Sequence, residues 1–212
     1  MNSHEMTKRR FLTAASGFVI LPSVLMIMPG RVFGQGMPTV EQVLFDPEVP
    51  MLGNPKGDVT IVEFFDYQCP YCKRVHPDVT RVVREDGKVR LVMKDWPIFG
   101  EPSLYASRLA LAATEQGAHA AALHALMKTE GRLQDSTVDT ALKGAGLDPK
   151  ALQDKYRAHA SKVDGIIGRN TAQARAFGLP GTPAFIVGTT HFPGVLDANG
   201  LRQALSDARK KG

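Results

Sequence analysis

The sequence predicts a globular α/β protein in which helices cover the faces of one parallel or mixed sheet. Three observations support this fold class: a strand, helix, strand order in residues 59–98, an alanine-rich helical block over residues 101–176, and a return to strand and helix after it. With 212 residues, 43% of them hydrophobic, the chain is long enough to bury an ordinary core.

The first unit begins with "VTIVEFFDY", residues 59–67, an apolar run rich in β-branched and aromatic side chains. This composition is typical of a strand buried on both faces. Residues 71–85 follow as a helix, because apolar side chains recur there at helical spacing: Val75, Val79, Val82 and Val83. "KVRLVMKDWPI", residues 88–98, then reads as a second strand.

The second half of the chain adds helices and closes the sheet. Residues 101–176 have almost no β-branched runs and predict three or more helices. "TPAFIVG" predicts another buried strand, and "THFPGVLD" predicts an edge strand, since Pro193 and Gly194 are tolerated there. The chain ends with an amphipathic helix over residues 198–212.

The N-terminal residues 1–34 read as an export signal. A basic start precedes an apolar stretch over residues 11–28, and small residues follow it, which predicts cleavage near Gln35. Arg9-Arg10 before Phe11-Leu12 also resembles a twin-arginine signal. The alternatives are an uncleaved leader that tethers the protein to a membrane, or a buried helix. Export implies a periplasmic or other extracytoplasmic location, where disulfides persist.

The net charge of +5 does not indicate nucleic-acid binding. Three of these five charges come from the leader, whose charged residues are Glu5, Lys8, Arg9, Arg10 and Arg31. The remainder of the chain has no Lys/Arg cluster interleaved with aromatic residues. The sequence therefore predicts no nucleic-acid partner.

The two cysteines, Cys69 and Cys72, lie at the predicted junction of strand and helix, in "DYQCPYCKRV". The free amides and the positive dipole end at a helix start favour a thiolate at the first sulfur. Cys69 is therefore the predicted nucleophile. Cys72, one turn later, is the predicted resolving thiol, which attacks a mixed disulfide formed at Cys69.

Two other uses of the cysteine pair fit less well. A zinc site needs about four ligands, and the remaining ones would have to be histidines that show no paired spacing: His76, His119, His124, His159 and His191. A purely structural disulfide would close a very short loop and so remove little chain entropy. A redox pair that needs no metal and no organic cofactor is the preferred interpretation.

Glu63 lies in the middle of the most apolar predicted strand, six residues before Cys69. A carboxylate is costly there, and burial would raise its pKa and allow it to exchange a proton with Cys72. The alternative is an edge strand with Glu63 facing solvent. Lys94, near the end of the next strand, is a candidate partner for Glu63 or a solvated lysine.

"GLPGTPAFIV" places Thr182-Pro183 just before a predicted buried strand. This arrangement suits a cis peptide bond that leaves Thr182 backbone groups free to bind an extended substrate chain, although an ordinary trans turn is the alternative.

Together, Glu63, the order Cys69-Pro70-Tyr71-Cys72 and the distant Thr182-Pro183 resemble the DsbA family of exported thiol:disulfide oxidoreductases. The resemblance implies a thioredoxin fold with an inserted helical domain. It also implies that Cys69 attacks, that Cys72 resolves, that Glu63 is buried near the pair, and that a cis Pro183 faces the sulfurs. Substrate chains are expected to contact four residues: Pro70, Tyr71, Thr182 and Pro183.

The expected organisation is a signal peptide over residues 1–34 and an extended lead-in over 35–58. A thioredoxin-like domain comprises residues 59–100 and 177–212, interrupted by the helical domain over 101–176. Only about 20 residues separate the predicted cleavage site from the fold, whereas dimeric isomerases of the family carry an N-terminal dimerisation domain. A monomer is expected.

The predicted function is to introduce disulfides into reduced substrate proteins, with a separate redox partner that reoxidises Cys69-Cys72. Pro70-Tyr71 and Thr182 are also found in isomerising and reducing relatives, so an isomerase or reductase that acts on misoxidised proteins is the second interpretation. The remaining alternatives are a chaperone-like module that only binds peptides and a glutathione-linked enzyme of the same fold.

Overall fold

The fold is described from a computed structural model, in which residues 37–211 are described. Within these residues one sheet has the order β1-β3-β2-β4-β5, in which β2 and β3 are parallel and every other neighbouring pair is antiparallel. The strands are β1 (Met51–Gly53), β2 (Val59–Phe65), β3 (Val89–Asp95), β4 (Ala184–Val187) and β5 (Thr190–Phe192). The mixed α/β fold class is confirmed.

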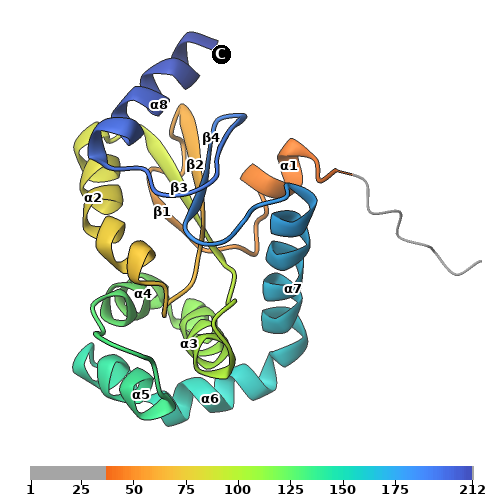
Figure 1. Cartoon of the computed structure of the whole chain (residues 1–212). Coiled ribbons are helices and arrows are strands. Elements are labelled where there is room, and N and C mark those ends of the chain that lie inside the picture. Colours follow the sequence, from red (N-terminus) through yellow and green to blue (C-terminus); the bar gives the residue numbers. More distant parts are fainter. Residues whose placement is uncertain (1–36, 212) are drawn as a thin grey trace, which may run out of the picture. The chain divides into compact units, whose positions relative to one another are not determined.

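Helices cover both faces of the sheet and extend beyond one end of it. They are α1 (Val40–Leu44), α2 (Pro70–Asp86), α3 (Glu101–Ala112), α4 (His119–Met127), α5 (Asp135–Gly144), α6 (Pro149–Ala158), α7 (Ala160–Ala176) and α8 (Ala198–Lys211), with a short 3-10 helix at Ala113–Gln116. Figure 1 shows α2 and α8 on one side of the sheet, α1 and α7 on the other, and α3 to α6 beneath the end where α2 begins. Helices α3 to α7 all lie between β3 and β4 in the chain.

The core has two parts, one on each side of the sheet. Alternate side chains of β2 point to opposite faces, so Ile61 and Phe65 pack towards α2 and α8, whereas Val62 and Phe64 pack towards α1 and α7. All seven residues of β2 are buried. This confirms the prediction of a strand covered on both faces, which its apolar composition indicated.

The sequence predicts an extended lead-in over residues 35–58, but the described part of it, residues 37–58, contains the helix α1 and the strand β1. Thr39 and Gln42 form a capping box that starts α1, because each side chain accepts a hydrogen bond from the other's backbone amide. β1 then adds to the edge of the sheet by pairing with β3. The backbone groups of β1 form hydrogen bonds with β3, and the local sequence does not show this pairing.

The predicted leader, with its twin-arginine resemblance and its cleavage site near Gln35, lies outside the described residues. Over residues 37–211, no helix is both long enough and apolar enough to cross a membrane.

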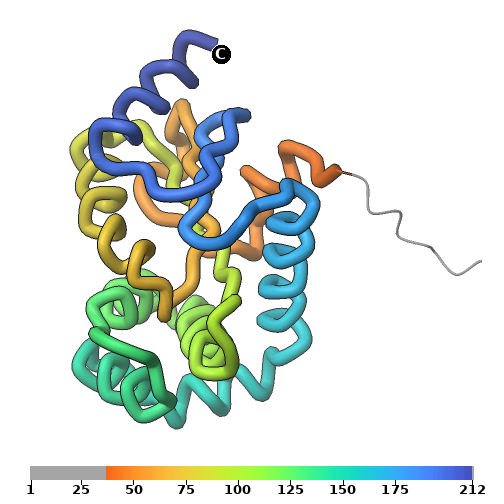
Figure 2. The backbone as a smooth tube through the Cα atoms, in the orientation of Figure 1, coloured from red at the N-terminus to blue at the C-terminus, as the bar shows by residue number. Residues whose placement is uncertain are grey.

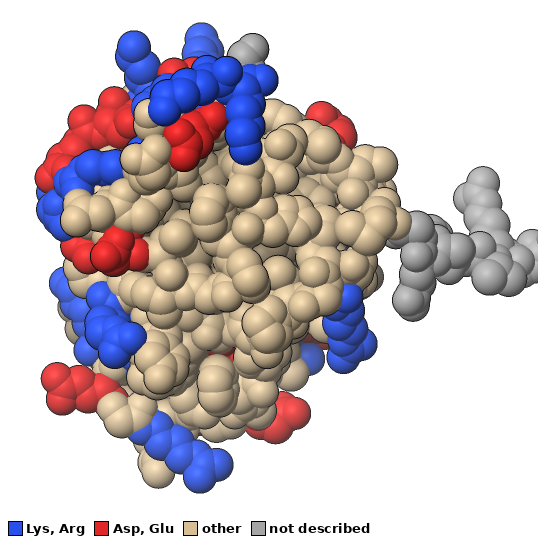
Figure 3. All heavy atoms as spheres, turned by 45° about the horizontal axis from the view of Figure 1, so that its top comes forward, with Lys and Arg blue, Asp and Glu red and all other residues tan. Residues whose placement is uncertain are grey.

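The basic residues of this part of the chain are interspersed with acidic ones. On the face shown in Figure 3, Lys and Arg side chains gather near the C-terminal helix with Asp and Glu among them, and the middle of the face carries few charges. Arg209 of α8 illustrates the pairing, because its guanidinium contacts Asp58 at 2.9 Å and Asp86 at 2.7 Å. No broad basic surface is visible on this face.

Lys94 of β3 is fully buried between the sheet and α7. Its ammonium lies 3.5 Å from Oδ1 of Asn170, and burial lowers the pKa of Lys94 to about 8. A lowered pKa for a base means that the unfolded chain binds this proton more tightly than the folded protein does. The lysine therefore destabilises the fold at neutral pH.

We expect Lys94→Met to stabilise the protein at pH 7 by on the order of 2 kcal/mol, because methionine fills the same space without a charge. The gain should be largest below pH 8 and disappear as the pH rises towards 10.5, where the lysine of the unfolded chain also loses its proton. Urea unfolding at several pH values measures it. Lys162→Met, at an exposed ion pair, is the control and should change little. A variant less stable than wild type at pH 7 would contradict this account.

Candidate redox site

The two cysteines lie where β2 leads into α2. Cys69 is the N-cap of α2, and Pro70 occupies the first helical position, where a missing amide hydrogen costs nothing. The Cys72 amide donates to the sulfur of Cys69 at 3.4 Å. The predicted strand and helix junction is thus confirmed, and the first sulfur takes the place of a side-chain helix cap.

The two thiols have different acidities because their surroundings differ. The pKa of Cys69 is lowered to about 6, chiefly by the hydrogen bond from Cys72 and further by Thr182 and by backbone amides at the helix start. The pKa of Cys72 is raised above its ordinary value, first by burial and then by its bond to Cys69 and the nearby Glu63. Cys69 is therefore a thiolate at neutral pH, whereas Cys72 stays protonated.

Cys69 is less accessible than an exposed nucleophile would be. Only 1% of the residue is exposed, and its sulfur lies 3.2 Å from the carbonyl oxygen of Thr182. In this conformation the loop before β4 covers the sulfur. Neighbouring groups must shift before another sulfur can reach it.

The loop that covers Cys69 contains the cis peptide bond Thr182-Pro183, as the sequence predicts. Figure 2 follows the chain from α7 through this loop and back into the sheet. The hydroxyl of Thr182 is buried and has no hydrogen-bond partner within residues 37–211. Thr182 is one of the groups that lower the pKa of Cys69.

Glu63 is fully buried in β2, and neither of its carboxyl oxygens has a partner among the described residues. Burial, and then the charge of Cys69, raise the pKa of Glu63 to about 8. The carboxyl therefore carries a proton at neutral pH. The prediction that Glu63 is buried is confirmed, and the alternative of a solvent-facing residue on an edge strand is wrong.

Lys94 is not a partner of Glu63. In the register of β2 and β3, Glu63 pairs with Met93 and Phe64 pairs with Lys94. Because consecutive side chains alternate between the two faces of a sheet, Lys94 points away from Glu63. It contacts Asn170 instead, so it is neither the predicted partner nor a solvated lysine.

Asp66 is a buried site residue that the sequence analysis did not select. One carboxyl oxygen accepts from the Gln68 amide at 2.6 Å and the Ser103 hydroxyl at 2.7 Å. The other accepts from the amides of Ile98 at 2.7 Å and Phe99 at 3.1 Å. These four bonds fix the loop before Cys69 to the loop after β3. Like Glu63, Asp66 is a carboxylate within an apolar run of the sequence, and this pattern could have identified it.

Other polar residues near the site are the buried Asp95 and a pair of histidines. Asp95 is fully buried at the end of β3, and burial raises its pKa to about 8. His76 of α2 and His124 of α4 form a hydrogen bond of 2.8 Å, although their spacing in the sequence gives no sign of it. Over residues 37–211, however, no three His, Cys, Asp or Glu residues are grouped as a metal site would require.

Comparison with known proteins identifies the family. A family model described as "Thioredoxin" matches residues 46–207. The chain belongs to the thioredoxin family. This thioredoxin-family protein is similar to a thioredoxin-like oxidoreductase from Silicibacter pomeroyi DSS-3, with 42% identity, a TM-score of 0.78, and coverage of 82% of this chain and 99% of that one.

A second solved relative is the thiol-disulfide exchange protein alpha-DsbA2 from Wolbachia pipientis. It is 31% identical, with a TM-score of 0.73 and coverage of 79% of this chain and 90% of that one. The resemblance to DsbA-type proteins, drawn from Glu63, the cysteine motif and Thr182-Pro183, is thus confirmed for the fold and the family.

Among curated proteins, this thioredoxin-family chain is 30% identical over 168 residues to the Na(+)/H(+) antiporter NhaA 1 of Mycolicibacterium gilvum (strain PYR-GCK). The match covers 77% of this chain but only 27% of the antiporter. The chain therefore spans about a quarter of the length of the curated relative, which matches it over one segment.

The lowered pKa of Cys69 predicts how its reactivity changes with pH. We expect the rate of alkylation by iodoacetamide to rise about tenfold between pH 5 and pH 7 and to level off above that, because only the thiolate reacts. An ordinary thiol with a pKa near ~8.5 would continue to gain reactivity up to about pH 9. Mass spectrometry assigns the modified residue, and Cys72 serves as the internal control, since its raised pKa should leave it unmodified.

Proposed function

We propose that the protein exchanges disulfides with cysteine-containing substrate proteins through Cys69 and Cys72, in the direction that oxidises the substrate. The observation that carries the proposal is the position of the Cys69 sulfur as the N-cap of α2, where its thiolate is stabilised. A stabilised thiolate favours the reduced form of the pair, and a pair that favours its reduced form is an oxidant.

The exchange takes place in two steps. A substrate thiolate attacks the Cys69 sulfur of the oxidised pair, the bond between Cys69 and Cys72 breaks, and Cys72 leaves with the electron pair. A second substrate thiolate then attacks the substrate sulfur of the mixed disulfide, which forms the substrate disulfide and releases Cys69 as a thiolate. The substrate loses two electrons and the cysteine pair gains them.

Glu63 handles the proton of Cys72 in this scheme. Its carboxyl is protonated at neutral pH, it lies close enough to Cys72 to raise the pKa of that thiol once it is ionised, and neither of its oxygens has another partner in the described part of the chain. It therefore gives its proton to Cys72 as the disulfide opens and takes one back when Cys72 attacks in the reverse direction.

Substrate contact is assigned to the residues around the sulfur: Pro70, Tyr71, Thr182 and Pro183. Tyr71 is 52% exposed beside Cys69, and the side chains of Ile98 and Phe99 are also exposed nearby. These groups offer an apolar rim to an unfolded or partly folded chain.

A separate redox partner must reoxidise the pair, since each turnover leaves it reduced. The leader pattern favours an extracytoplasmic location, in which this oxidising function is useful.

The proposal also includes the domain division that the sequence predicts. A thioredoxin-like domain comprises residues 59–100 and 177–212, and a helical domain comprises residues 101–176. The protein is proposed to be a monomer.

The isomerase or reductase interpretation rests on Pro70-Tyr71 and on Thr182, whose carbonyl oxygen lies 3.2 Å from the Cys69 sulfur. Equilibration with glutathione buffers of graded ratio decides between the directions. A reduction potential of about −120 mV, typical of strongly oxidising dithiol proteins, would support a protein that donates its disulfide to substrates. A potential near ~−270 mV would overturn it in favour of a reductase.

Trapping tests the chemistry itself. In Cys72→Ser, we expect mixed disulfides between Cys69 and reduced substrate proteins to accumulate, because the resolving thiol is absent. Non-reducing electrophoresis detects them, and Cys69→Ser is the matched control that should trap nothing. A module that only binds peptides would instead show equal substrate affinity in wild type and both variants.

Glu63→Gln keeps the shape of the side chain but cannot transfer a proton. We expect steps that protonate or deprotonate Cys72 to slow by about 100-fold at pH 7, which is within the range for a positioned acid or base. Stopped-flow measurement of single-turnover oxidation follows these steps. Alkylation of Cys69 in the same variant is the control, and an unchanged turnover would remove Glu63 from the mechanism.

A further inference from the structure

A short segment of the helical block contacts the residues on both sides of the cysteine motif. The side-chain oxygen of Gln68, just before Cys69, accepts from the amide of Leu133 at 2.8 Å. The ammonium of Lys73, just after Cys72, donates to the hydroxyl of Thr129 at 2.9 Å. The chain over residues 129–133, between α4 and α5, therefore borders the redox site.

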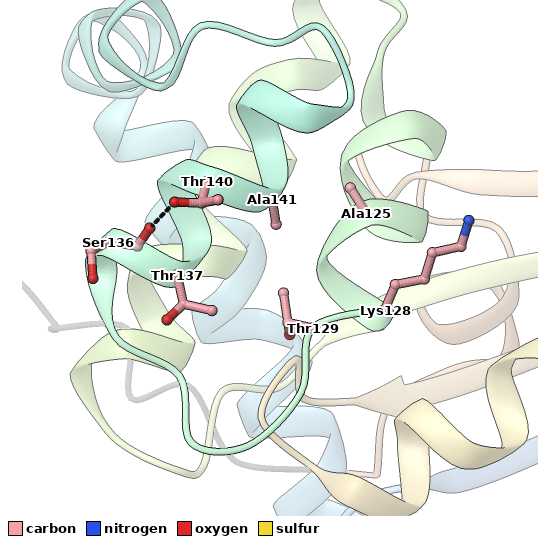
Figure 4. A pocket seen from close by; sticks show the side chains of 7 residues that line it. All are labelled: Ala125, Lys128, Thr129, Ser136, Thr137, Thr140 and Ala141. Atoms are coloured by element: carbon pink, nitrogen blue, oxygen red, sulfur yellow. Dashed lines mark hydrogen bonds between the residues drawn. The ribbon is translucent and has the colours of Figure 1, made fainter.

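The same segment forms one edge of a hollow of about 500 Å³ between α4 and α5. Figure 4 shows methyl groups and hydroxyls around this space, while the Lys128 side chain extends away from it. The residues that line it are Ala125, Lys128, Thr129, Ser136, Thr137, Thr140 and Ala141. The hollow is open to solvent, and its volume lies within the range of sites that bind small ligands.

The lining suits a polar peptide better than an apolar one. The hydroxyl hydrogens of Thr129 and Thr140 are donated to the carbonyls of Leu126 at 2.7 Å and Ser136 at 2.8 Å. Because Thr129 also accepts from Lys73, it keeps one oxygen lone pair, whereas Thr140 keeps two, to accept peptide amides. Thr137 forms no side-chain hydrogen bond with the residues that are described, so its hydroxyl is free to donate to a peptide carbonyl.

We propose that this hollow is a subsite for a polar segment of the substrate polypeptide, a few residues away from the substrate cysteine that reacts at Cys69. The proposal rests on the proposed function. Lys73, which contacts the edge of the hollow, lies four residues after Cys69, about 6 Å along α2. An extended chain advances about 3.3 Å per residue, so a peptide bound at Cys69 reaches the hollow within about six residues.

The test compares substrates of different length in wild type and in Thr137→Arg, which fills the hollow with a long side chain. The probes are glutathione, a peptide with two polar residues on each side of one cysteine, and a peptide with about eight on each side. Oxidation of each probe is followed by stopped-flow fluorescence. Ser161→Arg, on the exposed surface of α7, is the matched control.

In wild type we expect KM for the long peptide to be about fivefold lower than for the short one, which corresponds to one or two added polar contacts. Thr137→Arg should remove this difference and leave kcat, the reaction with glutathione and the alkylation profile of Cys69 unchanged. The isosteric Thr137→Val should raise KM for the long peptide by a smaller factor, and Ser161→Arg should behave as wild type.

Two outcomes contradict different parts of the scheme. If wild type oxidises all three probes but the long and short peptides have equal KM, or if Thr137→Arg and Thr137→Val keep the difference, the subsite is wrong and the redox function stands. If wild type oxidises none of the probes, the proposed function itself fails.

Discussion

The redox site depends on one constraint, the burial of β2 on both faces of the sheet. A strand that is buried on both sides has one register and one direction in the sheet. The residues that directly follow its C-terminal end are therefore held in fixed positions by the core. Asp66 then holds the loop after β2 through four hydrogen bonds, and Cys69 follows as the N-cap of α2. The sulfur is positioned by the core rather than by a flexible loop.

The chemical difference between the two cysteines follows from that placement. They are three residues apart, yet one lies at the amide-rich start of a helix and the other is buried against the β2 carboxyl that shares its environment. Opposite shifts of their pKa values then assign one sulfur to attack and the other to resolution. No metal is required for this division, because helix amides and burial perform it.

Much of this was predictable from local patterns, and what was not depends on residues distant in the chain. The apolar run around Glu63, the cysteine spacing and the Thr182-Pro183 turn are each legible over a few residues. The role of Asp66 is not, since three of its four donors come from residues more than thirty positions later. Lys94 was placed wrongly because its face depends on the register with β2, which no single strand reveals. The edge strand β1 was missed for the same reason.

The alternation of side chains in the central strand pair also separates the buried ionisable groups of the two strands. Glu63 and Asp95 belong to one face of the sheet, while Lys94 belongs to the other. The sheet therefore keeps the Lys94 ammonium on the face opposite the two carboxyl groups, although Lys94 is next to Asp95 in the chain, and the ammonium contacts Asn170 instead. Because burial raises its pKa to about 8, Glu63 keeps its proton at neutral pH until a sulfur takes it. The proton store of the site is maintained by the geometry of the sheet.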